Sequence, residues 1–361
     1  MRLILTLALL GFLAACARPG SEVLTLVKPQ AGAKTVTILV ATNRTPGKEI
    51  EGAFMSGRSE RLRYAEVIVS IPPRHKPPQI EWPNGKPDPM NTFAVVGSRS
   101  LSRDEFVMLA QRNNREKPAG VFVHGYNYSY QEALFRLAQM SSDAALDGAP
   151  ILFDWPSKAS LAGYIADRDA AAFSRDDFVS VLNDLGKAGV RTDILAHSMG
   201  AWLAVETIRQ LSLMKRADTL SQIDELVLAA PDIDIDLFGK QLAMTDRLRK
   251  PIVILAAKDD LALALSRRLA GSAATAGALD INDPRTQQLA ARDNLMIVDI
   301  SKLPSMNGSN HDRFAALAAV YPQLRNQGRG NPVAGTGAFV LNGVGAVVSA
   351  PFKLGGAALS Q

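Results

Sequence analysis

A serine between two small residues carries the clearest chemical signal in this sequence. It lies in the pentapeptide Ala196-His197-Ser198-Met199-Gly200, which follows a short apolar run and precedes a predicted helix. A sharp turn from strand to helix needs small residues on both flanks, and it lifts the serine hydroxyl out of the sheet. Ala196 and Gly200 meet that requirement. We therefore predict that Ser198 is a nucleophile; the alternative is an ordinary helix start with an incidental serine.

A second turn could help this serine by binding negative charge. The segment Val123-His124-Gly125-Tyr126-Asn127 also follows an apolar run and precedes a predicted helix. Hydrolysis by a serine needs backbone N–H groups aimed at the developing oxyanion. Gly125 lets the backbone turn, and we predict that the N–H groups of Tyr126 and Met199 form this oxyanion hole. The side chain of His124 is better explained as a buried structural histidine.

The chain has four histidines, and one of them suits a general base. A neutral serine is a weak nucleophile and needs such a base. His75 lies in a proline-rich segment, His124 belongs to the second turn, and His197 cannot fold back onto its own neighbour. His311 lies in a polar loop after the last apolar run. It therefore follows the serine in the order serine, acid, histidine that this kind of site uses.

The acid that would orient His311 is less clearly marked by position alone. Asp259 and Asp260 stand side by side after the apolar run 252–255, which is the usual place for the acid. The preceding apolar run is followed by Asp232, Asp234 and Asp236, which are the alternatives. Each of these carboxylates could instead cap the helix that follows it. Position alone therefore leaves the acid open between the two neighbours.

The elements that must position these residues alternate along the chain. Short apolar runs predict strands, and segments with apolar residues at helical spacing predict helices between them. Ser174, with Asp177 three residues on, resembles a helix start. Buried strands that alternate with helices form a mostly parallel sheet covered by helices on both faces, which is the α/β class. The predicted strands are 36–41, 64–71, 120–123, 150–153, 193–196, 226–229, 252–255 and 295–298, and the predicted helices include 130–146 and 201–213.

Composition and charge narrow the classes of partner and cofactor. Apolar residues make up 47% of the chain and charged residues 21%, which is ordinary for a globular protein. The net charge is +5, but the basic residues are scattered among acidic ones, so we expect no nucleic-acid partner. The spacing of histidine and carboxylate residues offers no metal site, and we expect neither a metal nor an organic cofactor. The oligomeric state stays open.

The first residues read as an export signal. Arg2 is followed by an apolar run, from Leu3 to Leu13, that is too short to span a bilayer. The sequence Leu13-Ala14-Ala15-Cys16 resembles the lipobox of bacterial lipoproteins, in which the cysteine receives lipid, and Cys16 is the only cysteine of the chain. We expect a lipid anchor at Cys16 in the bacterial cell envelope. Ala17 follows the cysteine, and a residue other than aspartate at this position is similar to the sorting signal for the outer membrane. We therefore expect the protein on the outer membrane, facing the periplasm.

These observations predict four segments. Residues 1–15 are the lipoprotein signal peptide, and residues 16–35 are a tether. Residues 36–327 form the enzyme domain, including a loop at 72–90 with seven of the 20 prolines. Residues 328–361 hold eight glycines and an apolar run at 338–350. That run is too short to span a membrane, so the tail is either disordered or lies on the domain or on a lipid surface.

Several motifs together resemble one known family. The pentapeptide AHSMG, the turn HGYN, the strand end ATNR and the segments FDWPS, LAAPDID and DDLALALSRRLAG are similar to those of the DUF900 family of bacterial α/β-hydrolases, over about residues 36–320. In the family pattern an aspartate precedes x-Ala-Leu and Ser-Arg-Arg-Leu. Here that position is Asp260, so the resemblance favours Asp260 over Asp259 as the acid. It also implies the α/β-hydrolase fold.

The expected function is that of a serine hydrolase. Ser198, Asp260 and His311 would form a catalytic triad that hydrolyses a carboxylic ester, small or lipid, through an acyl-enzyme. Amide hydrolysis, thioester hydrolysis or acyl transfer on the same triad are the alternatives, because the shape of the substrate pocket decides among them. A further alternative is an envelope lipoprotein that uses a hydrolase scaffold only for binding.

Overall fold

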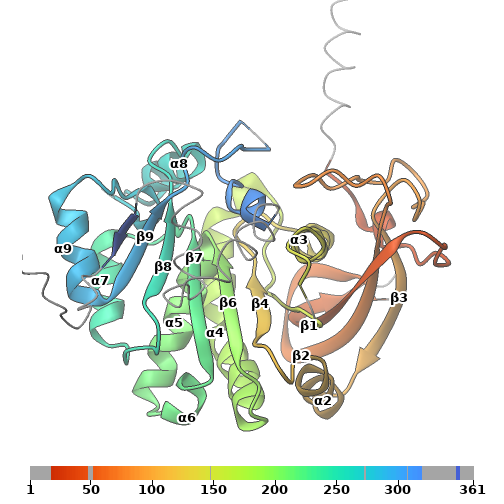
Figure 1. Cartoon of the computed structure of the whole chain (residues 1–361), viewed down its shortest axis with the longest axis horizontal. Helices are drawn as coiled ribbons and strands as arrows, with labels where there is room; N and C mark the ends of the chain where they lie inside the picture. The colour runs from red at the N-terminus through yellow and green to blue at the C-terminus, as the bar shows by residue number, and fades with distance from the viewer. Residues whose placement is uncertain are drawn as a thin grey trace, which may run out of the picture.

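Ten strands of the chain form one sheet (Figure 1). The structure is a computed structural model and describes residues 18–47, 52–146, 148–271, 274–306, 308–318 and 347–349. The strands of the described residues are β1 (Lys34–Pro46), β2 (Phe54–Ile71), β3 (Ala94–Leu101), β4 (Ala119–Val123), β5 (Ile151–Asp154), β6 (Thr192–His197), β7 (Ile223–Ala229), β8 (Ile252–Ala256), β9 (Leu295–Asp299) and β10 (Val347–Ser349). Their order across the sheet is β10-β9-β8-β7-β6-β4-β5-β1-β2-β3.

The centre of the sheet is parallel and its two sides are antiparallel. The strands from β9 to β1 run parallel, whereas β2, β3 and β10 pair antiparallel with their neighbours. In a parallel sheet the carboxyl ends of the strands share one edge, and ligands bind in the crevice outside that edge. The segments that follow β4, β6, β8 and β9 contain Tyr126, Ser198, Asp260 and His311 in turn. The topology therefore gathers the candidate site residues at one edge.

Helices cover both faces of the sheet (Figure 1). Apolar residues alternate along the strands: Val121 and Val123 of β4 belong to one buried cluster, and Phe122 between them belongs to the other. This alternation is the geometry of a strand that is buried on both faces. The helices of the described residues are α2 (Arg103–Asn113), α3 (Tyr130–Asp143), α4 (Tyr164–Lys187), α5 (Met199–Leu213), α6 (Ala217–Leu220), α7 (Ile235–Ala243), α8 (Leu261–Ala270) and α9 (Pro284–Asp293), with short 3-10 turns η1 (Ser21–Leu24), η2 (Leu161–Gly163) and η3 (Ala276–Ala278).

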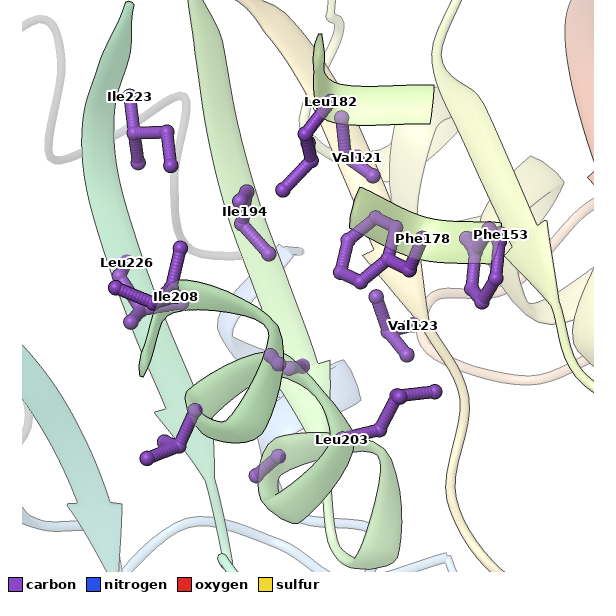
Figure 2. Close-up of a cluster of buried hydrophobic side chains, with 14 of the residues drawn as sticks. Val121, Val123, Phe153, Phe178, Leu182, Ile194, Leu203, Ile208, Ile223 and Leu226 are labelled. Carbon is purple, nitrogen blue, oxygen red and sulfur yellow. The ribbon is translucent and has the colours of Figure 1, made fainter. Parts of the chain in front are cut away.

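The larger buried cluster fixes α5, the helix that begins directly after Ser198. Figure 2 shows Ile194 of β6 and Leu226 of β7 facing Ile208 of α5. In the same cluster, Phe178 of α4 stacks on Phe153 of β5, with ring centroids 4.4 Å apart. Each buried side chain of this size contributes about 1.5–3 kcal/mol when it is removed from water. The elements on both sides of the candidate nucleophile are therefore held by the core.

The structure confirms the α/β class and corrects several local predictions. Ser174 does not start a helix: it lies within α4, where its hydroxyl donates to the carbonyl of Ala170. The helix α2 was not predicted, although Ser102 and Glu105 form a capping box at its start. Part of the predicted tether packs on the domain, because Val23 and Leu24 are buried. Of the predicted tail, only β10 lies within the described residues, and it pairs with β9.

Candidate active site

Ser198 lies in a strained turn between β6 and α5. Its φ and ψ are 54° and −121°, which is a conformation that L-residues rarely adopt. Three main-chain hydrogen bonds hold it there. The N–H of Ser198 donates to the carbonyl of Ala229 over 2.9 Å, and the carbonyl of Ser198 accepts from the N–H of Asp232 over 3.3 Å and from that of Ala201 over 3.0 Å. The neighbouring strand thus fixes a backbone that the local sequence alone would not favour. This conformation is that of a nucleophile elbow.

Two glycines let the elbow pack against the turn after β4. A Cβ atom on Gly200 would lie 2.1 Å from the carbonyl oxygen of His124, so no larger residue fits there. A Cβ atom on Gly125 would lie 2.7 Å from Nδ1 of His197 and 2.9 Å from Cβ of Ser198. The turn that contains Tyr126 therefore lies directly against the serine. Both glycines serve close approach of the chain, and neither has a positive φ.

The two amide groups predicted for the oxyanion hole belong to Met199, next to Ser198, and to Tyr126, in the turn that packs against Ser198. Met199 is the first residue of α5, where backbone N–H groups have no partner within the helix. Among the hydrogen bonds of the described residues, none is donated by the N–H of Tyr126 or of Met199. The side chain of Tyr126 is engaged elsewhere, because its hydroxyl donates to the carbonyl of Leu161 and its ring packs edge-on against Tyr164. Both N–H groups are thus available to an acceptor.

His311 is bonded to one carboxylate, that of Asp260. Nδ1 of His311 lies 2.7 Å from Oδ2 of Asp260. A carboxylate accepts hydrogen bonds, so Nδ1 carries the proton and Nε2 is left as the acceptor. The other oxygen, Oδ1, accepts from the N–H of Leu263 over 3.0 Å, so Asp260 also caps α8. The orientation of His311 therefore depends on a carboxylate that is itself fixed by a helix start.

The other candidate acids have different partners. Asp259 forms an ion pair with Arg313, whose guanidinium hydrogen bonds hold the pKa of this carboxyl below its usual range. Asp232 accepts from the hydroxyls of Tyr164 and Ser266, and Asp234 caps α7. Asp236 lies exposed in the first turn of α7. Asp259 is exposed, as expected for the neighbour of the candidate acid, whereas Asp260, the carboxylate that bonds His311, also caps α8.

His197 joins the elbow to the loop of His311. Nε2 of His197 lies 3.2 Å from the carbonyl oxygen of His311, and the two rings are 4.6 Å apart. Its ring also stacks on Phe314 at 4.3 Å. Burial lowers the pKa of His197 well below its ordinary value, so the ring is neutral. No role could be predicted for His197 from its position in the chain; its contacts with the His311 loop provide one.

A buried ion pair supports the turn that contains Tyr126. Arg44 pairs with Asp154 over 2.8 Å, and both side chains are fully buried. Burial alone would raise the pKa of Asp154, but Arg44 and His124 hold it below the usual value. His124 stacks on Trp155 and bonds Asp154, so its side chain is structural, as its position suggested. Arg44 and Asp154 were not identified as functional residues, although they lie in the ATNR and FDWPS motifs.

Two further features of the described residues bear on cofactors and membranes. No group of three or more histidine, cysteine or acidic side chains in the described part of the chain could hold a metal ion. No helix there is long and apolar enough to cross a membrane. Cys16, the residue predicted to carry lipid, lies outside the described residues.

One known family matches the part of the chain that contains the parallel strands β4 to β9. The family described as "Alpha/beta hydrolase of unknown function (DUF900)" matches residues 102–328, which include Tyr126, Ser198, Asp260 and His311. The chain belongs to this family. The DUF900 match thus covers every candidate catalytic residue, and the fold is that of an α/β-hydrolase. A search of curated proteins gave no match.

Solved structures of other hydrolases resemble this DUF900 chain distantly. A predicted CIB-like hydrolase from Thermoplasma acidophilum is 15% identical, with a TM-score of 0.31, over 73% of this chain and 93% of that one. A dienelactone hydrolase from Anabaena variabilis is 12% identical, with a TM-score of 0.34, over 75% and 95%. An esterase from Rhizomucor miehei is 10% identical, with a TM-score of 0.33, over 82% and 86%.

Proposed function

We propose that this chain is a serine hydrolase of carboxylic esters, with Ser198 as the nucleophile. The observation that carries the proposal is the hydrogen bond between His311 and Asp260, on a loop that contacts the residue preceding Ser198. His311 is the general base, and Asp260 keeps its Nε2 free to accept a proton. The N–H groups of Tyr126 and Met199 form the oxyanion hole.

The proposed reaction passes through an acyl-enzyme. His311 takes the proton of the Ser198 hydroxyl while the oxygen attacks the ester carbonyl, and the resulting oxyanion accepts hydrogen bonds from Tyr126 and Met199. The imidazolium then gives its proton to the leaving alcohol. A water molecule attacks the acyl-enzyme, with His311 again as the base, and releases the acid. Asp260 stabilises the imidazolium in both halves of the cycle.

A fluorophosphonate probe tests this proposal, because such a probe phosphonylates an activated serine. We expect wild-type protein to be labelled and Ser198→Ala to be unlabelled. Ser221→Ala is the matched control, since Ser221 is exposed and its hydroxyl donates to the nearby carbonyl of Asp218. A panel of acyl esters, amides and thioesters then separates the ester hydrolase from the alternative activities. Equal labelling of the wild type and Ser198→Ala would remove the assignment, and no labelling at all would favour a binding protein.

We also propose that the protein is exported and attached to the outer membrane through lipid on Cys16. The course of the chain next to this cysteine supports the proposal. Arg18, two residues on, pairs with Glu132 at 2.8 Å and donates to the carbonyl of Asn127 beside the oxyanion turn. An anchor at Cys16 would therefore bring the catalytic edge close to the bilayer. Leu161 and Ile165 at this edge are 74% and 76% exposed, which suits contact with lipid.

Fractionation of cells tests the anchor. Wild-type protein should remain with membranes after a carbonate wash, and Cys16→Ser should be soluble or unprocessed. Because the chain has a single cysteine, this change removes the one site for thioether-linked lipid. If Cys16→Ser stays with membranes as the wild type does, the attachment lies elsewhere in the chain.

A further inference from the structure

A small cavity lies beside the nucleophile elbow, on the side of α5. It is lined in part by Met199, the residue after Ser198, and by Trp202 one helical turn further on. Its volume is about 50 Å³. Since a single water needs about 10–15 Å³ on this measure, the cavity holds a group of a few heavy atoms. That is enough for a carboxylate or a phosphate and too little for a long acyl chain.

Two residues that line the cavity each contain a buried donor without a partner in the described structure. The hydroxyl of Thr275 and the indole N–H of Trp202 are both buried, and neither makes a hydrogen bond within the described structure. Thr275 is only 3% exposed. A buried polar group without a partner destabilises the folded state, so such groups need an explanation. A bound ligand that accepts hydrogen bonds would supply one.

Two arginines line the same cavity. Arg168 comes from α4 and Arg267 from α8. Among the described residues, no carboxylate forms an ion pair with either guanidinium within 4 Å. Arginine presents a planar set of donors that matches carboxylate and phosphate oxygens in pairs. These two side chains therefore add charge to the donors of Thr275 and Trp202.

The two aspartates of the cavity already serve donors of the protein. Asp232 accepts from Tyr164 over 3.0 Å and from Ser266 over 2.7 Å, and burial raises its pKa, which favours its neutral form. Oδ1 of Asp234 accepts from two N–H groups at the start of α7. Their acceptor capacity is thus largely directed into the protein. The remaining polar residues of the lining are the donors Arg168, Arg267, Thr275 and Trp202.

We propose that this cavity binds an anionic group, a carboxylate or a phosphate, on the substrate of the hydrolase. Arg168 and Arg267 would supply the charge, and Thr275 and Trp202 the shorter hydrogen bonds. The inference rests on the proposed function, because it assigns the cavity to the substrate of Ser198. The proposal also gives a role beyond the triad to two of the family motifs. LAAPDID contains Asp232 and DDLALALSRRLAG contains Arg267, and both residues line the cavity.

Anion binding to the resting protein tests the cavity without catalysis. Titration calorimetry with inorganic phosphate and with adipate should show binding to the wild type at low salt. Arg267→Gln, Arg168→Gln and Thr275→Val should each weaken it, with a loss of about tenfold for the arginine variants. Arg268→Gln is the matched control, because Arg268 is the next residue of α8, is exposed and does not line the cavity. The preferred anion separates carboxylate from phosphate.

Substrate preference provides the second measurement. Mono-4-nitrophenyl adipate and 4-nitrophenyl hexanoate have the same chain length and differ in the terminal charge. We expect wild-type kcat/KM to be at least about tenfold higher for the adipate ester, and Arg267→Gln to bring the values for the two esters within about twofold of each other. Arg268→Gln should keep both wild-type values. If neither anion binds, or Arg268→Gln and Arg267→Gln bind them equally, the cavity proposal is overturned even when Ser198 reacts with the probe. Failure of the probe to label Ser198 would instead overturn the proposed function.

Discussion

The ring of His197 donates a hydrogen bond to the main chain of His311. The carbonyl oxygen of His311 can only accept, so the proton lies on Nε2 of His197, 3.2 Å away. Nδ1 of His197 is buried, without a partner in the described structure. The residue before the candidate nucleophile therefore fixes the backbone of the candidate base. This contact sets the distance between two groups that lie more than a hundred residues apart in the chain.

Replacing His197 by phenylalanine should slow turnover without unfolding the protein. His197→Phe keeps a ring for packing against Phe314 but lacks the donor to His311. Misplacement of a catalytic group by about 1 Å can cost a factor of about 100 in rate. We expect a loss of this order in kcat, with a similar KM and a melting temperature within a few degrees of the wild type. Unchanged kcat would mean that the His311 loop is held by other contacts.

Removing the charge of Asp260 should be far more damaging than removing that of Asp259. Asp260→Asn should lower turnover by about four orders of magnitude, because His311 loses its tautomer and its counter-charge. Asparagine caps helices about as well as aspartate, so the start of α8 should persist. Asp259→Asn should cost less than tenfold, since it affects the contacts with Arg313 and Asn310 but leaves the bond between Asp260 and His311 intact.

Single-turnover and steady-state rates on one activated ester would decide between the two carboxylates. An inactive Asp259→Asn with an active Asp260→Asn would move the acid by one residue. If both variants are active, Asp232 is the next residue to test. Its carboxylate interacts electrostatically with His311, although its hydrogen bonds are with Tyr164 and Ser266.

A methyl group on Gly125 should disturb the serine directly. In Gly125→Ala the new Cβ would meet Cβ of Ser198 at 2.9 Å, and overpacking of this kind costs about 1–3 kcal/mol. We expect both stability and kcat to fall. Gly120→Ala in β4 is the control, because its Cβ would have no heavy atom within 4 Å. Chemical denaturation and kcat should therefore separate the two variants; equal behaviour would show that the turn can move away.

The stability of the protein should depend on pH through His75. Burial lowers the pKa of this ring, but hydrogen bonds with Asp143 and Glu81 outweigh burial and raise the pKa above its ordinary value. Because the folded state binds the proton more tightly, the stabilisation is fully present below about pH 6.5 and is lost as pH rises through the folded pKa. The melting temperature of the wild type should fall over that interval.

The matched variant for this test is His75→Gln. Its melting temperature should be lower than that of the wild type at pH 6, and should change less between pH 6 and pH 9. Glu81→Gln should reduce the same pH dependence, since it removes one of the two carboxylates. A wild type and a His75→Gln variant with parallel pH curves would rule out this residue as the source.

The sequence by itself determined the features that depend on neighbours along the chain. Apolar runs of four or five residues predicted the positions of the central strands, because a strand that is buried on both faces has few polar side chains. The small residues around Ser198 predicted the elbow, whose φ of 54° the structure shows. With four histidines in the chain, elimination left His311 as the candidate base.

The tertiary structure decided which distant groups meet. Position along the chain does not distinguish Asp259 from Asp260, and only the resemblance to the family favoured Asp260. The direction of the side chains at the end of β8 brings Asp260 to a histidine 51 residues away. The fully buried pair of Arg44 and Asp154, 110 residues apart, has no local signal for the same reason. Ser174 has the local pattern of a helix start, but the core extends α4 back to Tyr164. Local spacing reports contacts within about four residues, whereas these contacts depend on the path of the whole chain.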